Sequence, residues 1–354
     1  MKLLAKTLLL VIVLQACTET KESRISSLPE SGGELAEIVV ISDNKTLDSS
    51  YKVLIKKVFG KEIEGYPPPY EPTFKVLTTD ETFFRGYFKT HHNIIVLLTG
   101  DNLEEMKGIY GEVNTQKIKD IIGNSEALGL KQKELWAQNQ NVFYVTAPTK
   151  EAMETKLSER SNELLEVALS HERLSGKRKL FTNSSKRDSF YVKTLRENGY
   201  AIRKPASYRV AMDEPKFKWL RKSPASKELE FDIILFESPY TNENQLHTDS
   251  LLAVRNKFTK KYIPGEYDGS YMKYSDVIIP NRKQVNYKNK YSIELKGWWD
   301  MHGDYMGGPS FIKAIVDHKK GRIVYVEGFL FHPNEKKAKQ MRELEMIMNT
   351  VVLD

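Results

Sequence analysis

The sequence KGWWDMHGDYMGGPSFIKAIVDHKKGRIVYVEGFLFHP, residues 296–333, predicts the centre of the fold in the second half of the chain. It contains two runs rich in Ile, Val, Tyr and Phe, at Phe311–Asp317 and Arg322–Phe331, separated by a short polar link that ends in glycine. This pattern is typical of a β-hairpin. A third run, Tyr291–Trp299, precedes the hairpin and is joined to it by Asp300–Pro309. We therefore expect a three-stranded antiparallel meander.

The connection Asp300–Pro309 is the first candidate for ligand or partner contact. It carries three glycines beside polar and aromatic side chains, and glycine lets a ligand approach the main chain. The aromatic rings suit contact with a sugar or a peptide. The candidate contact residues are Trp299, Asp300, His302, Asp304 and Tyr305. The alternative is a tight connection whose glycines serve geometry and whose tryptophans belong to the core.

The sequence contains no recognised catalytic motif. The hydrolase elbow G-x-S-x-G, the P-loop, G-x-G-x-x-G and H-E-x-x-H are all absent. His302, His318 and His332 follow no metal-ligand spacing, so we predict neither a metal nor a cofactor. A non-enzymatic binding or scaffold module is expected. The alternative is an envelope hydrolase that acts on glycan or peptide through Asp300, His302, Asp304 and Glu327.

The first residues predict export and a lipid anchor. Two lysines, a short apolar run and LQAC at residues 14–17 resemble a bacterial lipoprotein signal, with Gln15 where a small residue is preferred. The apolar run is too short to span a bilayer. Cys17 would then be the acylated first residue, which anchors the protein to membrane lipid of the cell envelope. The alternative is an ordinary cleaved signal in which Cys17 is incidental.

Composition narrows the class of protein. A single cysteine among 354 residues excludes a disulfide framework and a multi-cysteine metal cluster. The formal net charge of +7 falls to +5 without Lys2 and Lys6. The remaining lysines are scattered among glutamates, so no nucleic-acid partner is expected. The length suggests about two domains.

The order of expected elements divides the chain into two domains. The first half alternates strands, such as Asn93–Thr99, with helices, such as Ser49–Phe59 and Thr149–Arg173, which predicts an α/β domain. The second half reads as a mostly antiparallel sheet flanked by helices, the last at Lys336–Val351. The predicted parts are a signal at residues 1–16, a flexible tether at 17–34, an α/β domain at 35–174, a basic linker at 175–187 and an α+β sandwich at 188–354.

Several stretches resemble one known family. They include KTHHNIIVLL at residues 89–98, WAQNQNVFYVTAP at 136–148, YIPGEYDGSYM at 262–272 and VYVEGFLFHP at 324–333. The chain resembles the Bacteroidetes-type lipoproteins that are grouped as a domain of unknown function. The second half is also similar to the PsbP/Mog1-type sandwich in its order of strand meander and final helix. The resemblance implies an envelope location and an envelope protein or glycan as a possible partner, but transfers no catalytic residue.

Overall fold

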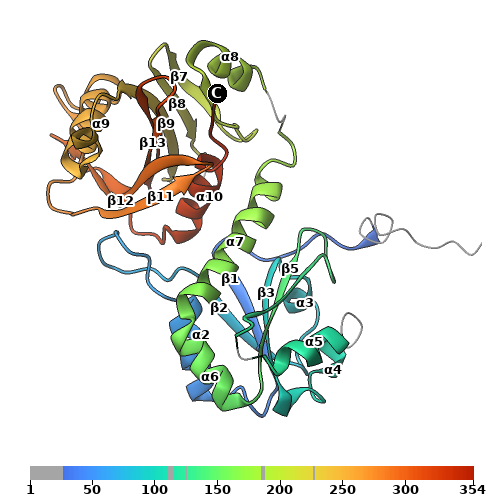
Figure 1. Ribbon diagram of the computed structural model, residues 1–354. Coiled ribbons are helices and arrows are strands. Elements are labelled where there is room, and N and C mark those ends of the chain that lie inside the picture. The colour runs from blue at the N-terminus through green and yellow to red at the C-terminus, as the bar shows by residue number, and fades with distance from the viewer. Residues whose placement is uncertain (1–26, 111–114, 125, 185–187, 226–227) are drawn as a thin grey trace, which may run out of the picture.

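The computed structural model describes residues 27–354, apart from 111–114, 125, 185–187 and 226–227. The chain forms two domains joined by a long helix (Figure 1). Both the predicted signal and Cys17 lie outside the described residues. No helix in the described part is both long and apolar enough to cross a membrane.

The first domain is a three-layer α/β structure. Its sheet has the order β2-β1-β3-β5-β4, and all neighbours are parallel except β4 and β5. Strands β1 and β3 are buried along their whole length, as continuous apolar runs predict for a sheet covered on both faces. The strands are β1 Glu37–Ser42, β2 Lys75–Asp80, β3 Asn93–Thr99, β4 Gly129–Lys133 and β5 Asn141–Ala147.

Helices cover both faces of this sheet. One face packs against α2, α6 and α7, and the other against α4 and α5. The helix α2 begins where the Asp48 carboxylate accepts a hydrogen bond from the Tyr51 amide at 2.8 Å. The helices are α2 Ser49–Phe59, α3 Tyr87–Thr90, α4 Lys107–Tyr110, α5 Thr115–Ile122, α6 Lys150–Glu159 and α7 Ser161–Leu180, with a 3₁₀ turn η1 at Gly100–Asn102.

The second domain is built on a curved antiparallel sheet. Its order is β10-β12-β13-β14-β9-β8-β7, and β11 pairs with the first part of β12. Its strands are β7 Arg209–Glu214, β8 Phe217–Lys222, β9 Glu230–Pro239, β10 Tyr271–Tyr274, β11 Asn281–Tyr287, β12 Lys290–His302, β13 Gly307–Asp317 and β14 Arg322–Phe331. A small pair of β6 Tyr200–Ala201 and β15 Val352–Leu353 lies apart. The expected meander is therefore present as β12, β13 and β14.

Helices flank this sheet on both faces, as expected. One face packs against α8 Ser189–Asn198 and α10 Ala338–Met348, and the other against α9 Thr248–Tyr262, which follows the 3₁₀ turn η2 Glu243–Leu246. The helix α8 ends at Gly199, whose left-handed φ of 68° suits a glycine C-cap. The fold is thus a mixed α/β architecture in two domains.

Three local expectations were wrong. The tether does not extend to residue 34, because residues 28–32 bind the first domain through backbone hydrogen bonds such as Ser31 N to Gln138 O at 3.2 Å. The expected linker at 175–187 begins inside a helix, since α7 continues to Leu180. The connection expected at Asp300–Pro309 is shorter, because β12 continues to His302 and β13 begins at Gly307, so that only Gly303 of its three glycines lies between the strands, with φ +76°.

Candidate functional site

A cleft of about 880 Å³ lies between the two domains. On the first domain it is lined by α7 and by residues 60–73, which we call the interdomain arm. On the second domain it is lined by β11, β12, β13 and α10. A volume of this size falls in the range of small-molecule sites, and such sites occur preferentially between domains. We therefore treat this cleft as the candidate functional site.

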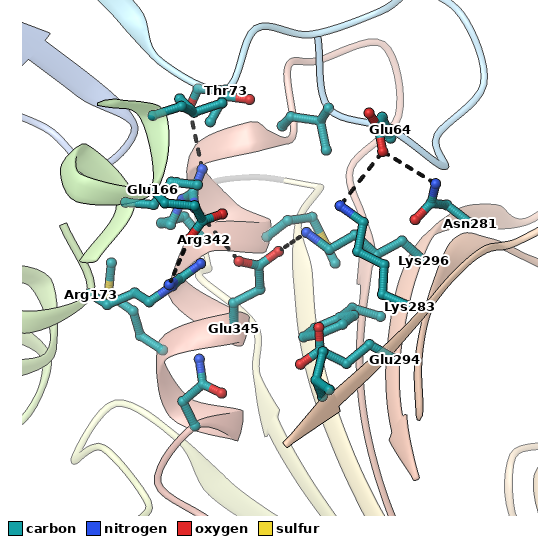
Figure 2. A pocket seen from close by; sticks show the side chains of 18 of the residues that line it. Glu64, Thr73, Glu166, Arg173, Asn281, Lys283, Glu294, Lys296, Arg342 and Glu345 are labelled. Atoms are coloured by element: carbon teal, nitrogen blue, oxygen red, sulfur yellow. Dashed lines mark hydrogen bonds and ion pairs between the residues drawn. The ribbon is translucent and has the colours of Figure 1, made fainter. Parts of the chain in front are cut away.

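The interdomain arm leaves the first domain after α2 and reaches the second (Figure 1). Tyr66 packs against the core of the second domain. Glu64 accepts a hydrogen bond from Asn281 at 3.3 Å and pairs with Lys283 at 3.6 Å (Figure 2). Gly65 adopts φ +94°, and a Cβ there would lie 2.6 Å from the Lys296 carbonyl oxygen, so only glycine fits this approach.

The arm also fixes the start of α10. The Glu71 carboxylate accepts hydrogen bonds from the backbone amides of Lys337 and Ala338, each at 2.8 Å. Amides at a helix N-terminus have no partner within the helix and carry partial positive charge, so a carboxylate stabilises them. Arg342, one turn further on, donates to the Thr73 carbonyl at 3.3 Å. The arm thus holds α10 in place as one wall of the cleft.

A buried carboxylate lies among cations at the centre of the cleft. Glu345 pairs with Lys296 at 2.6 Å and with Arg342 at 3.7 Å (Figure 2). Burial acts to raise its pKa, but the charges of Lys296, Arg342 and Arg173 outweigh burial and lower the pKa to about 2. The carboxylate is therefore ionised at neutral pH.

Lys313 forms the sheet side of the cleft and is almost fully buried. Its ammonium pairs with Glu294 at 3.1 Å, donates to Asn349 at 2.6 Å and lies 4.0 Å from the ring centroid of Tyr287. Burial lowers the pKa of this lysine. Strand register explains the pairing, because Lys313 and Glu294 are opposite each other on β13 and β12.

The polar lining carries more positive than negative charge. In the described part of the chain, seven cationic side chains line the cleft: Lys61, Arg173, Lys177, Lys283, Lys296, Lys313 and Arg342. Five carboxylates face them, namely Glu62, Glu64, Glu166, Glu294 and Glu345. Apolar side chains, among them Leu165, Leu169 and Phe311, share the walls. The arrangement combines an apolar surface with fixed charged donors, which suits the binding of a polar or amphipathic small molecule.

The structure does not gather the sequence-predicted contact residues around a cavity. Trp299 is 3% exposed, and its indole donates to the Leu330 carbonyl at 3.1 Å, so it belongs to the core and is not available for contact. His302 is exposed and packs against Tyr271. Tyr305 points into solvent, and an Asp304 oxygen accepts from the Tyr305 amide at 2.6 Å. Asp300 is half-buried at the end of β12, opposite Gly307.

Glu327, the fourth residue of the hydrolase hypothesis, is sealed inside the second domain. Its carboxylate receives the Arg255 guanidinium at 2.8 Å and 2.9 Å and the Ser310 hydroxyl at 2.7 Å. Both charged side chains are completely buried. The pair joins α9 to the face of β14 that this helix covers, and it makes no opening to solvent that a substrate could use.

A second buried polar cluster lies at the amino ends of β1 and β3. The rings of His91 and His92 stack with centroids 4.5 Å apart, and His92 contacts the Glu172 carboxylate at 2.7 Å. Glu37 lies 3.4 Å from His91 and pairs with Lys75 at 3.0 Å. These bonds tie α7 to the sheet. No group of metal ligands is formed in the described part of the chain.

Sequence reasoning missed the cleft because its lining comes from four distant segments. One available signal was a charged residue inside an apolar run, as Lys313 is in FIKAIV. Arg342 and Glu345 were similarly placed on the inner side of the last helix. Buried charges require partners, so such residues indicate a polar site inside the fold.

Each half of the chain is similar to a protein family that is described as a domain of unknown function. Residues 31–181 match a family described as Domain of unknown function (DUF8532), and residues 188–350 match Domain of unknown function (DUF4837). The expectation of such a family is confirmed at this level. No curated protein matches the chain significantly.

Three solved structures share weak similarity with the chain. A protein of unknown function and putative regulator, PA94 of Pseudomonas aeruginosa, has 13% identity and a TM-score of 0.26 over 43% of this chain and 90% of its own. LpqN of Mycobacterium tuberculosis, involved in cell envelope biogenesis, has 13% identity and a TM-score of 0.26 over 44% and 82%. Human STARD10 has 10% identity and a TM-score of 0.21 over 48% and 83%.

Proposed function

We propose that this protein is a lipid-anchored, non-enzymatic binding module of the bacterial cell envelope that holds a small molecule in the cleft between its domains. The observation that carries the binding role is the cleft of about 880 Å³, which combines charged and apolar side chains from both domains. The anchor rests on the lipoprotein-like start that ends in Cys17 and on the resemblance to Bacteroidetes-type lipoproteins.

The shape of the site supports binding through both domains. The interdomain arm packs Tyr66 onto the second domain, and α7 forms the opposite wall. A ligand in the cleft would therefore touch both domains at once and favour their present arrangement. The short loop between β12 and β13, at residues 303–306, offers no comparable enclosure. For this reason we place the ligand in the cleft and not at that loop.

The neutral fluorescent probe N-phenyl-1-naphthylamine tests the binding role, because its emission increases in an apolar site. We expect the wild-type protein to bind it and Leu165→Trp, which fills the cleft from α7, to weaken binding about tenfold. Val53→Trp is the matched control, since Val53 is 66% exposed on α2 and does not line the cleft. Equal affinity of all three proteins would refute the cleft as the site.

The anchor has a separate test. Cys17→Ala should leave the protein unprocessed or no longer firmly bound to membranes, because the residue that would carry the acyl chains is lost. Membrane fractionation and acyl labelling of the full chain measure this. A processed and membrane-bound Cys17→Ala variant would contradict the lipoprotein assignment without affecting the cleft.

A further inference from the structure

The cations on the α7 side of the cleft are only partly neutralised. Arg173 contacts Glu166 at 3.6 Å and lies near both Glu345 and Lys313. Lys177, one turn further along α7, contacts no carboxylate among the described residues. Two of the five acidic groups, Glu62 and Glu64, belong to the arm at the other side of the cleft. This part of the cleft therefore carries an excess of positive charge.

Like charges are held close together in this region. Burial lowers the pKa of Lys177, and the neighbouring Arg203 lowers it further. Burial also lowers the pKa of Lys288, with contributions from Lys177 and Lys313. The Lys288 ammonium donates to the Val351 carbonyl at 2.7 Å, which satisfies a hydrogen bond but supplies no full negative charge. An anion at this position would relieve the mutual repulsion of these cations.

Two buried donors in the cleft have no acceptor among the described residues. Arg342 is 6% exposed and uses its terminal nitrogens for Thr73 and Glu345, yet its Nε has no partner. The Tyr66 hydroxyl, contributed by the arm, is buried and also unpaired. Both residues line the cleft. Buried donors of this kind are costly to leave unpaired, so they favour a ligand that brings acceptor oxygens.

An apolar wall lies beside these charges. Leu165 and Leu174 reach the cleft from α7, Ile63 from the arm, and Val285 and Tyr287 from β11, and each keeps part of its surface exposed. A small inorganic anion would leave this wall in contact with solvent. A molecule with an apolar part would cover it, and removal of apolar surface from water contributes favourable free energy.

We propose that the ligand of the cleft is an amphipathic anion: a molecule with a carboxylate or phosphate group held near Arg173, Lys177 and Lys313, and with an apolar part against α7 and β11. This inference rests on the proposed function and names the chemistry of the molecule that the cleft binds. The anionic group can belong to a free amphiphile or to a lipid extracted from a bilayer, since both present the same chemistry.

A matched pair of probes separates this inference from the binding role. N-phenyl-1-naphthylamine is neutral, and 8-anilino-1-naphthalenesulfonate has the same ring system with an added sulfonate. We expect the wild-type protein to bind the sulfonate about tenfold more tightly, in keeping with charge-assisted hydrogen bonds. Lys177→Gln combined with Arg173→Gln should reduce the ratio of the two affinities to near one.

Arg178→Gln combined with Lys179→Gln is the control for this variant, because both residues lie on the same helix, the pair loses the same two charges and neither residue lines the cleft. The control should keep the wild-type ratio. Lys177 has no carboxylate partner among the described residues, so the single variant Lys177→Gln should fold normally, which circular dichroism and the melting temperature can check. This variant alone should lower the ratio of the two probe affinities. A sulfonate preference that persists in the double variant overturns the inference.

The remaining outcomes are also decisive. Equal binding of both probes overturns the anionic ligand while the binding role stands, and no binding of either probe overturns both. Displacement of the sulfonate probe by dodecyl phosphate but not by inorganic phosphate supports an amphipathic anion; displacement by inorganic phosphate alone overturns the apolar part. Displacement by phosphatidylglycerol vesicles identifies a bilayer lipid as the source, and displacement only by dodecyl phosphate identifies a free amphiphile.

Discussion

Glu327→Gln should strongly destabilise the second domain, because it leaves the charge of Arg255 buried and unpaired. Both side chains are completely buried, and the guanidinium meets the carboxylate at 2.8 Å and 2.9 Å. Removing one partner of such a pair costs roughly 3–5 kcal/mol. At about 2–4 °C per kcal/mol for a domain of this size, the melting temperature should fall by roughly 6–20 °C.

Urea unfolding followed by tryptophan emission measures this loss, since three of the four tryptophans, Trp219, Trp298 and Trp299, lie in the second domain. Glu335→Gln makes the same charge change on an exposed residue and should stay within about 0.5 kcal/mol of wild type. Replacing both partners, as in Glu327→Leu with Arg255→Met, should recover most of the stability, because no charge remains buried. A loss below about 1 kcal/mol for Glu327→Gln would refute this reasoning.

Three further predictions concern charge and close packing. In the folded protein the pKa of Glu345 is about 2, against an ordinary 4.5, so the unfolded chain takes up this proton first. The free energy of unfolding should therefore fall by up to about 3 kcal/mol as pH drops from 4.5 to 2. In Glu345→Gln the free energy of unfolding should not show this decrease with pH. Burial raises the pKa of Asp232 to about 6 despite its contact with Arg221 at 2.7 Å. The folded state therefore takes up this proton first, and this group favours folding increasingly as pH falls from about 6 to 4. The emission of Trp219, whose indole donates to Asp232 at 2.6 Å, should titrate near pH 6, and Asp232→Asn should abolish that transition. Gly308→Ala should lower the free energy of unfolding by about 1–3 kcal/mol, because its Cβ would lie 1.9 Å from the Leu330 carbonyl oxygen. Gly108→Ala, which has open space around it, should lose little stability in the same unfolding assay.

Local signals were sufficient for the elements that carry the core. The helix α2 and the strand β3 have the expected bounds, because a cap at Asp48 and a bounded apolar run mark their ends. The three-stranded meander was predictable for the same reason, since its strands and turn residues are contiguous in the sequence. The expected helix from Thr149 to Arg173 is instead two helices that meet at Arg160, a break that no proline or glycine marks.

Other features depend on contacts that a single stretch of sequence does not reveal. One such feature is the turn between β11 and β12, where Lys288 and Asn289 both adopt positive φ. Lysine is uncommon at such a position, so the turn was not expected. The glycine-rich loop drew attention for its composition, yet Gly308 serves close packing against β14.

The candidate site illustrates the same limit. Arg173, Lys296, Lys313 and Glu345 are separated by up to 172 positions in the printed numbering and come together only through the packing of α7, α10 and the sheet. Each residue alone is an ordinary charged side chain. Their shared environment, and with it the low pKa of Glu345, is a property of the assembled domains and not of any motif.

The hydrogen bonds from Lys337 and Ala338 to Glu71 join the two domains, and they also bear on the order in which the domains fold. During synthesis the first domain leaves the ribosome before α10 is made, and domains generally fold as units in that order. The last helix of the chain would therefore emerge beside an acceptor that is already in place. A second domain made without the first would have to begin α10 without this carboxylate, so the formation of this helix depends in part on the domain that precedes it.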